Sequence, residues 1–363
     1  MKRNRRRAPR RDIQVTGLRA TTASGVSRIS AEVDGVELFF ESSDVELSVS
    51  PQVFASALLP VAVRRRQRLR IDEALERRWR SGVADSMSVW ADWWQTEPKL
   101  SRVLVTPRRA ARGNSGPSAA GVGLCFSLGV DSFHTLLRAG RRVDYLILAE
   151  GYDIPLGDRV RVEAAQAALR EVAAGTGTQP ALVRTNLRVH PTLKRMGWQH
   201  THGGALAALG HACHGQISEL LISATKPFVA DRPWGSHWST DPGYSSSRLT
   251  VTHVGAELRR NDKLAAVIRE PLVRRHLRVC WENRAASGNC GECEKCVRTM
   301  LITSVVGDGG PLPAFPNGVP LARRIDRIQR IRSDSVPVYL RALEQGPDDA
   351  VHAAVERLLA RSG

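Results

Sequence analysis

Short apolar runs recur between residues 120 and 225, and each is followed by a longer segment in which apolar residues return at helical spacing. A short apolar run bounded by polar positions is typical of a buried strand, and apolar residues three or four positions apart are typical of a helix. The expected strands are residues 122–126, 143–148, 181–184 and 219–223. This alternation predicts an α/β fold with a doubly wound, mostly parallel sheet covered on both faces.

Helix signals separate these strands. One helix is expected from Phe133 onward, another between a cap at Asp158 and an end at Gly175, and a third over residues 203–214. In a doubly wound sheet, ligands bind beyond the carboxyl ends of the strands. The segments expected at that rim are residues 127–132, 150–153, 185–186 and 223–226.

The preceding region, residues 12–106, reads as an α+β part of unknown role. The elements expected there are a hairpin of residues 29–33 and 36–40 around Asp34-Gly35, and helices over residues 71–80 and 87–94. The tryptophans of this part are Trp79, Trp90, Trp93 and Trp94. Aromatic groups at helical spacing more often fill a core than stack on bases, so we interpret them as packing residues.

Charge raises the question of a nucleic-acid partner. The chain has 363 residues, 42% of them hydrophobic, and a net charge of +17, of which the first eleven residues supply +7. A basic tail of this kind attracts acidic partners without specificity, so nucleic acid is left open as a partner but not favoured. No run of about 18 apolar residues suggests a membrane span. No signal-peptide pattern opens the chain, and a cytoplasmic location is expected.

The turn between the first expected strand and its helix carries candidate chemistry. It reads Ser127-Leu128-Gly129-Val130-Asp131-Ser132. Backbone N–H groups at such a turn, with serine hydroxyls beside them, can hold a phosphate at the positive end of the helix. A strand–turn–helix that merely contains these residue types is the alternative.

Four of the six cysteines form a second motif. Cys280, Cys290, Cys293 and Cys296 follow the spacing C-x9-C-x2-C-x2-C, which suits a structural tetrahedral Zn²⁺ site. An iron–sulfur cluster also takes four thiolates, but the ferredoxin pattern expects a further Cys-Pro downstream, where this chain has Val297-Arg298-Thr299. A disulfide pair is the other alternative, and a cytoplasmic location disfavours it. The pattern therefore favours zinc.

Together the two motifs resemble the PP-loop ATP pyrophosphatases, and most closely their 7-cyano-7-deazaguanine synthase branch. The superfamily loop is S-G-G-x-D-S, and this chain has S-L-G-V-D-S with Leu128 in place of the first glycine. The synthase branch ends in C…C-G-x-C-x-x-C followed by Arg, which is matched from Cys280 through Cys290-Gly291 to Cys296 and Arg298. The resemblance covers roughly residues 120–300.

The resemblance implies an ATP-dependent C–N ligase that uses Mg²⁺ and Zn²⁺. A carboxylate or amide oxygen would be adenylated with release of pyrophosphate, and ammonia or another nitrogen nucleophile would then displace AMP. Asp131 would hold Mg²⁺ or orient the loop, Lys263 would add positive charge, and Glu150 would lie at the adenosine edge. The residues expected to contact the nucleotide phosphates are Ser127, Leu128, Gly129, Val130 and Ser132.

Further candidates concern the acceptor. The segments 232–238 and 241–248 are interpreted as a lid or substrate wall, the second being the nearest match to the synthase substrate loop. His202 is the histidine expected to face the site, and Cys125 and Cys213 are interpreted as small buried residues. The acceptor is expected to be a small-molecule carboxylate or a protein terminus. A non-catalytic nucleotide- or tRNA-binding module and a PP-loop tRNA-modifying enzyme remain alternatives, and a homodimer is left open.

The chain is therefore divided into four parts. These are a disordered basic tail at 1–11, an N-terminal domain at 12–106, a PP-loop nucleotide-binding domain at 120–275 and a zinc-binding and helical C-terminal region at 276–363. A Pro/Gly/Ser/Arg-rich linker at 107–119 separates the second part from the third.

Overall fold

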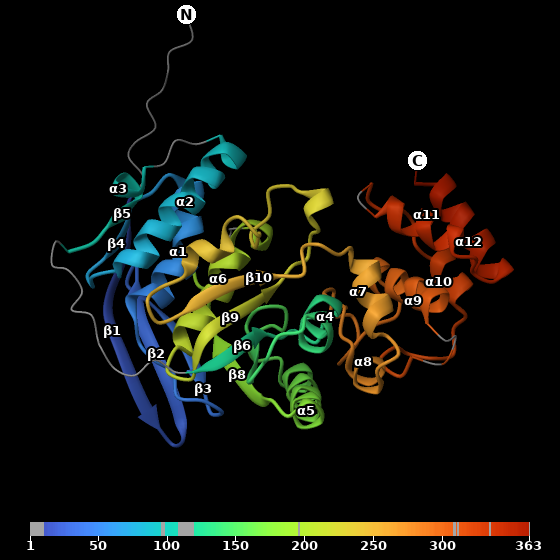
Figure 1. Ribbon diagram of the computed structural model, residues 1–363, viewed down its shortest axis with the longest axis horizontal. Helices are drawn as coiled ribbons and strands as arrows, with labels where there is room; N and C mark the ends of the chain where they lie inside the picture. Colours follow the sequence, from blue (N-terminus) through green and yellow to red (C-terminus); the bar gives the residue numbers. More distant parts are fainter. Residues whose placement is uncertain are drawn as a thin grey trace, which may run out of the picture.

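A single ten-stranded sheet organises the molecule. The computed structural model describes residues 11–95, 99–107, 120–194, 197–307, 310, 312–333 and 335–362. The strand order is β10-β9-β6-β7-β8-β3-β2-β1-β4-β5 (Figure 1). Neighbouring strands are parallel from β10 to β8, antiparallel from β8 to β1, and parallel again from β1 to β5. The predicted α/β class with a mostly parallel sheet is thus confirmed.

The four strands expected between residues 120 and 225 are all present as β6, β7, β8 and β9, whereas β1, β4, β5 and β10 were not anticipated. The strand bounds are β1 Ile13–Ala23, β2 Val26–Val33, β3 Val36–Ser42, β4 Leu69–Ile71, β5 Leu104–Val105, β6 Gly121–Cys125, β7 Tyr145–Glu150, β8 Gln179–Thr185, β9 Ile217–Ser223 and β10 Thr250–Val254.

Helices cover both faces of the sheet. On one face, α1, α2 and α6 pack in a common apolar core. On the other face, α4, α5, α7 and α8 form a second core. Helices α10 to α12 pack on α9 at the end of the molecule remote from β1 (Figure 1). The helix bounds are α1 Pro51–Arg65, α2 Arg77–Trp94, α3 Leu100–Val103, α4 Val130–Arg138, α5 Arg159–Thr176, α6 Trp198–Ala212, α7 Arg260–Val267, α8 Pro271–His276, α9 Glu294–Val306, α10 Leu321–Asp326, α11 Val336–Glu344 and α12 Asp349–Ala360, with short 3₁₀ turns at η1 Phe228–Ala230 and η2 Asp241–Tyr244.

The N-terminal hairpin forms as expected and joins the sheet. Val33 pairs with Val36, and Asp34 and Gly35 have φ of 53° and 80°, the left-handed pair that a tight two-residue hairpin requires. β3 then pairs antiparallel with β8. As a result, the parts expected as separate domains at 12–106 and 120–275 share one sheet and one apolar core.

Two helix predictions in the N-terminal part need correction. The segment 71–80 is not a helix, because Leu69–Ile71 forms β4 beside β1 and α2 begins only at Arg77. The helix expected at 87–94 is the last part of α2. Helix α1 was not predicted, because it is buried on nearly every side and its sequence shows no amphipathic period.

Other ends differ slightly from expectation. Asp158 does cap α5 by accepting a hydrogen bond from the Arg161 amide at 3.3 Å. The helix passes Gly175, whose Cα faces Leu272, and ends at Gly177, which takes the left-handed conformation with φ of 67°. Helix α6 begins five residues before the expected start at 203.

The remaining organisational predictions have mixed outcomes. Trp79 and Trp90 are fully buried, and Trp93 and Trp94 pack against the same core, so these residues do serve packing. The tail at 1–11, apart from Arg11, and the linker at 107–119, apart from Pro107, lie outside the described residues.

Candidate functional site

The candidate phosphate loop lies at the carboxyl edge of the sheet. It connects β6, which lies between β9 and β7, to α4. Ser127 is exposed there, and an added Cβ on Gly129 would lie 3.1 Å from the Ser127 hydroxyl oxygen. The Ser132 hydroxyl donates to the Gly129 carbonyl at 3.0 Å and is thus used in the first turn of α4. Of the two serines, Ser127 is the one available to a ligand.

Leu128 takes the backbone conformation of a glycine. Its φ is 61°, in the left-handed region that costs an ordinary residue about 1–2 kcal/mol. Its side chain is only 2% exposed and belongs to the apolar core under α4. Its carbonyl accepts a hydrogen bond from the Arg278 amide at 2.8 Å. The leucine therefore keeps a glycine-like turn and compensates for it by burial.

Asp131 meets two cations from α7. Its Oδ2 lies 3.4 Å from Nη1 of Arg260, and its Oδ1 lies 3.6 Å from Nζ of Lys263. Oδ1 is buried and has no hydrogen-bond partner among the described residues. Lys263 is 2% exposed and donates to the Ala224 carbonyl at 2.6 Å. Burial lowers the pKa of Lys263, and the nearby Asp131 opposes that shift.

A third cation comes from the cysteine region. Burial and repulsion from Arg260 lower the pKa of Lys295 to about 8, while Asp153 and Asp131 act in the opposite direction. Lys295 belongs to the first turn of α9, between two of the clustered cysteines. Lys295 thus interacts electrostatically with Asp131 although α9 and α4 are remote in sequence. The ion pair between Arg260 and Asp131 was not predicted, because the two residues are far apart in sequence and no local pattern links them.

The edge beyond β7 is held by internal contacts. The Glu150 carboxylate accepts from the Gly157 amide at 3.0 Å and lies 3.3 Å from Nε of Arg184. Gly151 has φ of 95°, and a Cβ there would lie 1.9 Å from the Thr185 carbonyl oxygen. Glu150 therefore closes the β7–α5 connection in this structure, and its contact with a nucleotide stays a prediction.

The four cysteines of the predicted metal site converge. The Sγ atoms of Cys280, Cys290, Cys293 and Cys296 all lie within 4.8 Å of one another. The Sγ atoms are 4.0 Å apart for Cys280 and Cys293 and 3.8 Å apart for Cys290 and Cys296. A zinc–sulfur bond of about 2.3 Å in tetrahedral geometry requires sulfurs about 3.8 Å apart. All four thiols are free, so the cluster fits a Zn²⁺ ion with every ligand position filled.

Asn289 clamps this cluster and was missed in the sequence. Its Oδ1 accepts from the amides of Val279 and Cys280 at 2.8 and 3.1 Å. Its Nδ2 donates to the carbonyls of Leu277 and Ala314 at 2.7 and 2.8 Å. The signal that could have found it is an amide side chain directly before Cys290, where a metal loop must fold back.

Two histidines of α6 are tied to backbone carbonyls. His202 Nδ1 lies 2.9 Å from the Trp198 carbonyl, and His211 Nε2 lies 2.9 Å from the Tyr244 carbonyl. Burial lowers the pKa of both rings, to about 4 for His211. Burial also raises the pKa of the Cys125 and Cys213 thiols.

Part of the segment interpreted as a lid or substrate wall belongs to the core. Asp241 and Tyr244 are fully buried. The Asp241 carboxylate accepts from Ser236 Oγ at 2.6 Å and from the His237 amide at 3.1 Å. His253 Nδ1 lies 2.8 Å from the same carboxylate. Buried carboxylates with several donors hold structure together, so this turn is a fixed element between α2 and α6 rather than a lid.

Comparisons with protein-family models, curated proteins and solved structures found no match to this chain. Among the described residues, none of the helices has the length and apolar character needed to cross a membrane.

Proposed function

We propose that the chain is an ATP-dependent ligase of the 7-cyano-7-deazaguanine synthase type, which adenylates a carboxylate or amide oxygen and releases pyrophosphate. The observation that supports this most directly is the pairing of Asp131, at the start of α4, with Arg260 and Lys263 of α7 at 3.4 and 3.6 Å. Two cations within 4 Å of the loop's carboxylate would neutralise the charge of a polyphosphate bound at the start of α4. The resemblance of the loop and of the cysteine spacing to that family supports the same assignment.

The cations provide charge neutralisation. Phosphoryl and adenylyl transfer require mainly positioning and stabilisation of the phosphate oxygens. The Lys263 ammonium is fixed by the Ala224 carbonyl, so it presents its charge without having to be ordered during binding. Arg260 is less buried and can turn from Asp131 toward a phosphate. Ser127 and the first amides of α4 would complete the contacts.

Asp131 fits the role of a Mg²⁺ ligand. Its Oδ1 is a buried carboxylate oxygen without a hydrogen bond, the donor type that Mg²⁺ prefers. Bound Mg²⁺ would supply Lewis-acid stabilisation of the phosphate charge. If Arg260 turns to the phosphates, Oδ2 of Asp131 loses that cation and the carboxylate would be free to hold the metal. The metal would then replace Arg260 as the positive charge beside the Asp131 carboxylate.

The reaction balances with ATP and a nitrogen nucleophile. The acceptor oxygen attacks the α-phosphorus, the bond from that phosphorus to the β-phosphate oxygen breaks, and pyrophosphate leaves. Ammonia then attacks the acyl carbon, loses a proton, and AMP departs. The residues of this chain position the two reactants and hold the leaving group, which is the larger part of such catalysis.

The cysteine cluster supports the site rather than reacting in it. Four thiolates fill the coordination of a zinc ion and leave no open position for a substrate. The cluster holds Lys295 on α9 and Arg278, whose amide binds the loop carbonyl of Leu128. Zinc would thus position part of the cationic group.

The tRNA-thiolating alternative has less support. Such an enzyme needs a reactive thiolate, whereas burial raises the pKa of Cys125 and keeps its thiol protonated. A nucleotide-binding module without catalysis shares the same cationic site, and only activity distinguishes it. The acceptor class remains a small-molecule carboxylate or a protein terminus.

The test is pyrophosphate release from ATP with Mg²⁺, ammonium and a panel of carboxylates. We expect release with at least one acceptor, and a loss of at least 100-fold in Asp131→Ala and Lys263→Met. Asp92→Ala and Lys99→Met, which remove the same charges from exposed positions, should keep wild-type rates. If the chain binds ATP but releases no pyrophosphate with any of the carboxylates, the result would support the non-catalytic module instead.

A further inference from the structure

Three side chains on the loop between β9 and η2 form a connected group of a carboxylate, an imidazole and a hydroxyl. His237 Nε2 is bonded to the Asp231 carboxylate, and His237 Nδ1 lies 2.7 Å from the Ser239 hydroxyl oxygen. A hydroxyl, an imidazole and a carboxylate joined in this order are the parts of a nucleophilic catalytic group. The candidate phosphate site around Asp131 uses none of the three.

The hydrogen bonds determine which ring nitrogen of His237 carries the proton. The Ser239 backbone amide donates to Nδ1 at 3.2 Å, so Nδ1 holds the lone pair and Nε2 carries the proton that Asp231 accepts. The Ser239 hydroxyl therefore donates to Nδ1 as well. In the serine-protease triad the two nitrogens have the opposite roles, but a neutral imidazole offers one donor and one acceptor in either orientation. His237 is thus placed to accept the serine proton.

The imidazole of His237 is held between two indoles. Its ring centre lies 4.7 Å from that of Trp93, on α2, and 5.3 Å from that of Trp238. The His237 amide donates to the buried Asp241 carboxylate at 3.1 Å, and the His237 side chain is only 4% exposed. A general base needs such a fixed orientation, because the proton is transferred only within hydrogen-bond reach.

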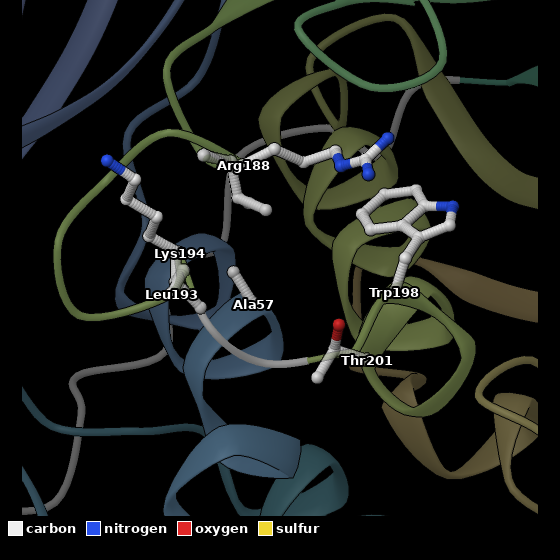
Figure 2. Close-up of a pocket in the computed structure, with 7 residues that line it drawn as sticks. Ala57, Arg188, Leu193, Lys194, Trp198 and Thr201 are labelled. Carbon is white, nitrogen blue, oxygen red and sulfur yellow. The ribbon is translucent and has the colours of Figure 1, made fainter. Parts of the chain in front are cut away.

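The loop that carries the group is anchored on the first turns of α6. The Gly235 amide donates to the Gln199 carbonyl at 2.6 Å, and the Gly235 carbonyl accepts from the Gly203 amide at 2.9 Å. Trp198, at the start of the same helix, lies under the Arg188 guanidinium, whose Cζ is 4.9 Å from the ring centre (Figure 2). A catalytic group on a loop needs supporting contacts of this kind to keep its geometry.

The group reaches the surface beside two exposed aromatic rings. Asp231 is 50% exposed, Ser239 is half-buried, and Trp238 next to it is 42% exposed. The Phe228 ring, which is 49% exposed, lies 5.5 Å from that of Trp238. Exposed apolar surface of this kind is typical of binding sites, and an apolar acyl group is the chemistry that it accommodates.

We propose that Ser239, His237 and Asp231 form a second catalytic site, which hydrolyses small carboxylic esters with an apolar acyl group. Ser239 Oγ bonds to the acyl carbon as its proton passes to His237 Nδ1, and the imidazolium gives that proton to the alcohol oxygen as the ester C–O bond breaks. Water then bonds to the acyl carbon and gives a proton to Nδ1. The bond to Ser239 breaks, Oγ regains the proton and the acid leaves.

Ester and water are the only reactants, and the activity is independent of the proposed ligase reaction. Asp231 accepts the Nε2–H bond throughout and stabilises the imidazolium that forms. The rings of Trp238 and Phe228 contact the acyl group.

The test is hydrolysis of p-nitrophenyl butyrate by the full chain, together with labelling by a fluorophosphonate probe, which bonds to activated serines. We expect the probe to label wild type at Ser239, as located by peptide mass spectrometry. Ser239→Ala should lose the label and at least 100-fold in kcat/KM. Ser247→Ala, which removes an exposed hydroxyl from the turn after η2, should keep both.

Two further variants test the roles of the neighbouring residues. Asp231→Asn keeps an acceptor for the Nε2 proton but removes the charge that stabilises the imidazolium. We therefore expect kcat to fall at least tenfold with KM nearly unchanged, and Asp231→Glu to recover part of the loss. Trp238→Ala should raise KM for the butyrate ester at least fivefold, and raise it less for the acetate ester.

Three results would overturn the inference: no labelling of wild type, labelling confined to another residue, or equal hydrolysis by wild type and Ser239→Ala. An unchanged kcat in Asp231→Asn would overturn the role of the carboxylate, and an unchanged KM in Trp238→Ala that of the apolar surface. Thermal unfolding is recorded for each variant. Ser239→Ala removes a single hydroxyl from a half-buried position, so it decides if another variant does not fold.

Discussion

The amide of Arg278 donates to the carbonyl of Leu128 across 2.8 Å, and this bond connects the segment that carries the first clustered cysteine to the candidate phosphate loop. Only one residue separates Arg278 from Cys280. We therefore expect a displacement of Cys280 to reach the loop through the two residues Val279 and Arg278.

Metal removal should consequently weaken the phosphate site. We expect about one zinc per chain by elemental analysis, and after chelation a lower unfolding temperature together with at least tenfold weaker binding of pyrophosphate. Both properties should return when zinc is restored. Unchanged pyrophosphate affinity in metal-free, folded protein would show that the two sites are independent.

At Leu128, substitution by glycine should be tolerated better than substitution by alanine, which is the reverse of the usual order. Both substitutions lose a buried side chain worth about 2–3 kcal/mol, but only glycine adopts the left-handed backbone without strain. We expect the free energy of unfolding, measured in urea, to be about 1 kcal/mol higher for Leu128→Gly than for Leu128→Ala. At Leu136, in ordinary helix, alanine should be the better tolerated by about the same amount.

Asn289 should control metal affinity without being a ligand. Asn289→Ala leaves the buried amides of Val279 and Cys280 without an acceptor, at a cost of about 1–3 kcal/mol each. We expect zinc affinity, measured by competition with a chromophoric chelator, to fall at least tenfold. Asn317→Ala, at an exposed position of the same region, serves as the control. An unchanged zinc affinity in Asn289→Ala would show that the four cysteines adopt their arrangement without the Asn289 side chain.

His211 should make the fold sensitive to acid. Burial lowers its pKa to about 4, below the value near 6.5 in an unfolded chain. Between these values the unfolded chain binds a proton that the folded chain does not, so the free energy of unfolding decreases as the pH falls from about 6.5 to 4. At about 1.4 kcal/mol per pKa unit, the full loss is roughly 3 kcal/mol.

Urea unfolding at several pH values checks this prediction. The stability of wild type should fall with pH more steeply than that of His211→Gln, whereas His352→Gln, at a position whose side chain is 44% exposed, should follow wild type. Parallel curves for wild type and His211→Gln would assign the acid sensitivity to other groups.

Much of the central sheet was predictable because its strands are short apolar runs with polar boundaries. The cysteine cluster was predictable because its ligands lie close together in sequence. The cations beside Asp131 were predictable only in part, because Lys263 was expected whereas Arg260 reaches Asp131 through the packing of α7 on α4. Helix α1 was missed because a helix buried on all sides has no polar face to reveal its period.

The pairing of β3 with β8 has a consequence for how the chain can be shortened. Without β3, β8 would become an exposed edge strand whose backbone N–H and C=O groups have no partner on that side. It would lie next to the apolar surface that α1 now covers. A chain begun at residue 120 would retain the phosphate loop and all four clustered cysteines, yet present this edge to other copies of itself. It would self-associate rather than remain dispersed, so β3 and α1 shield the edge at β8 from other copies of the chain.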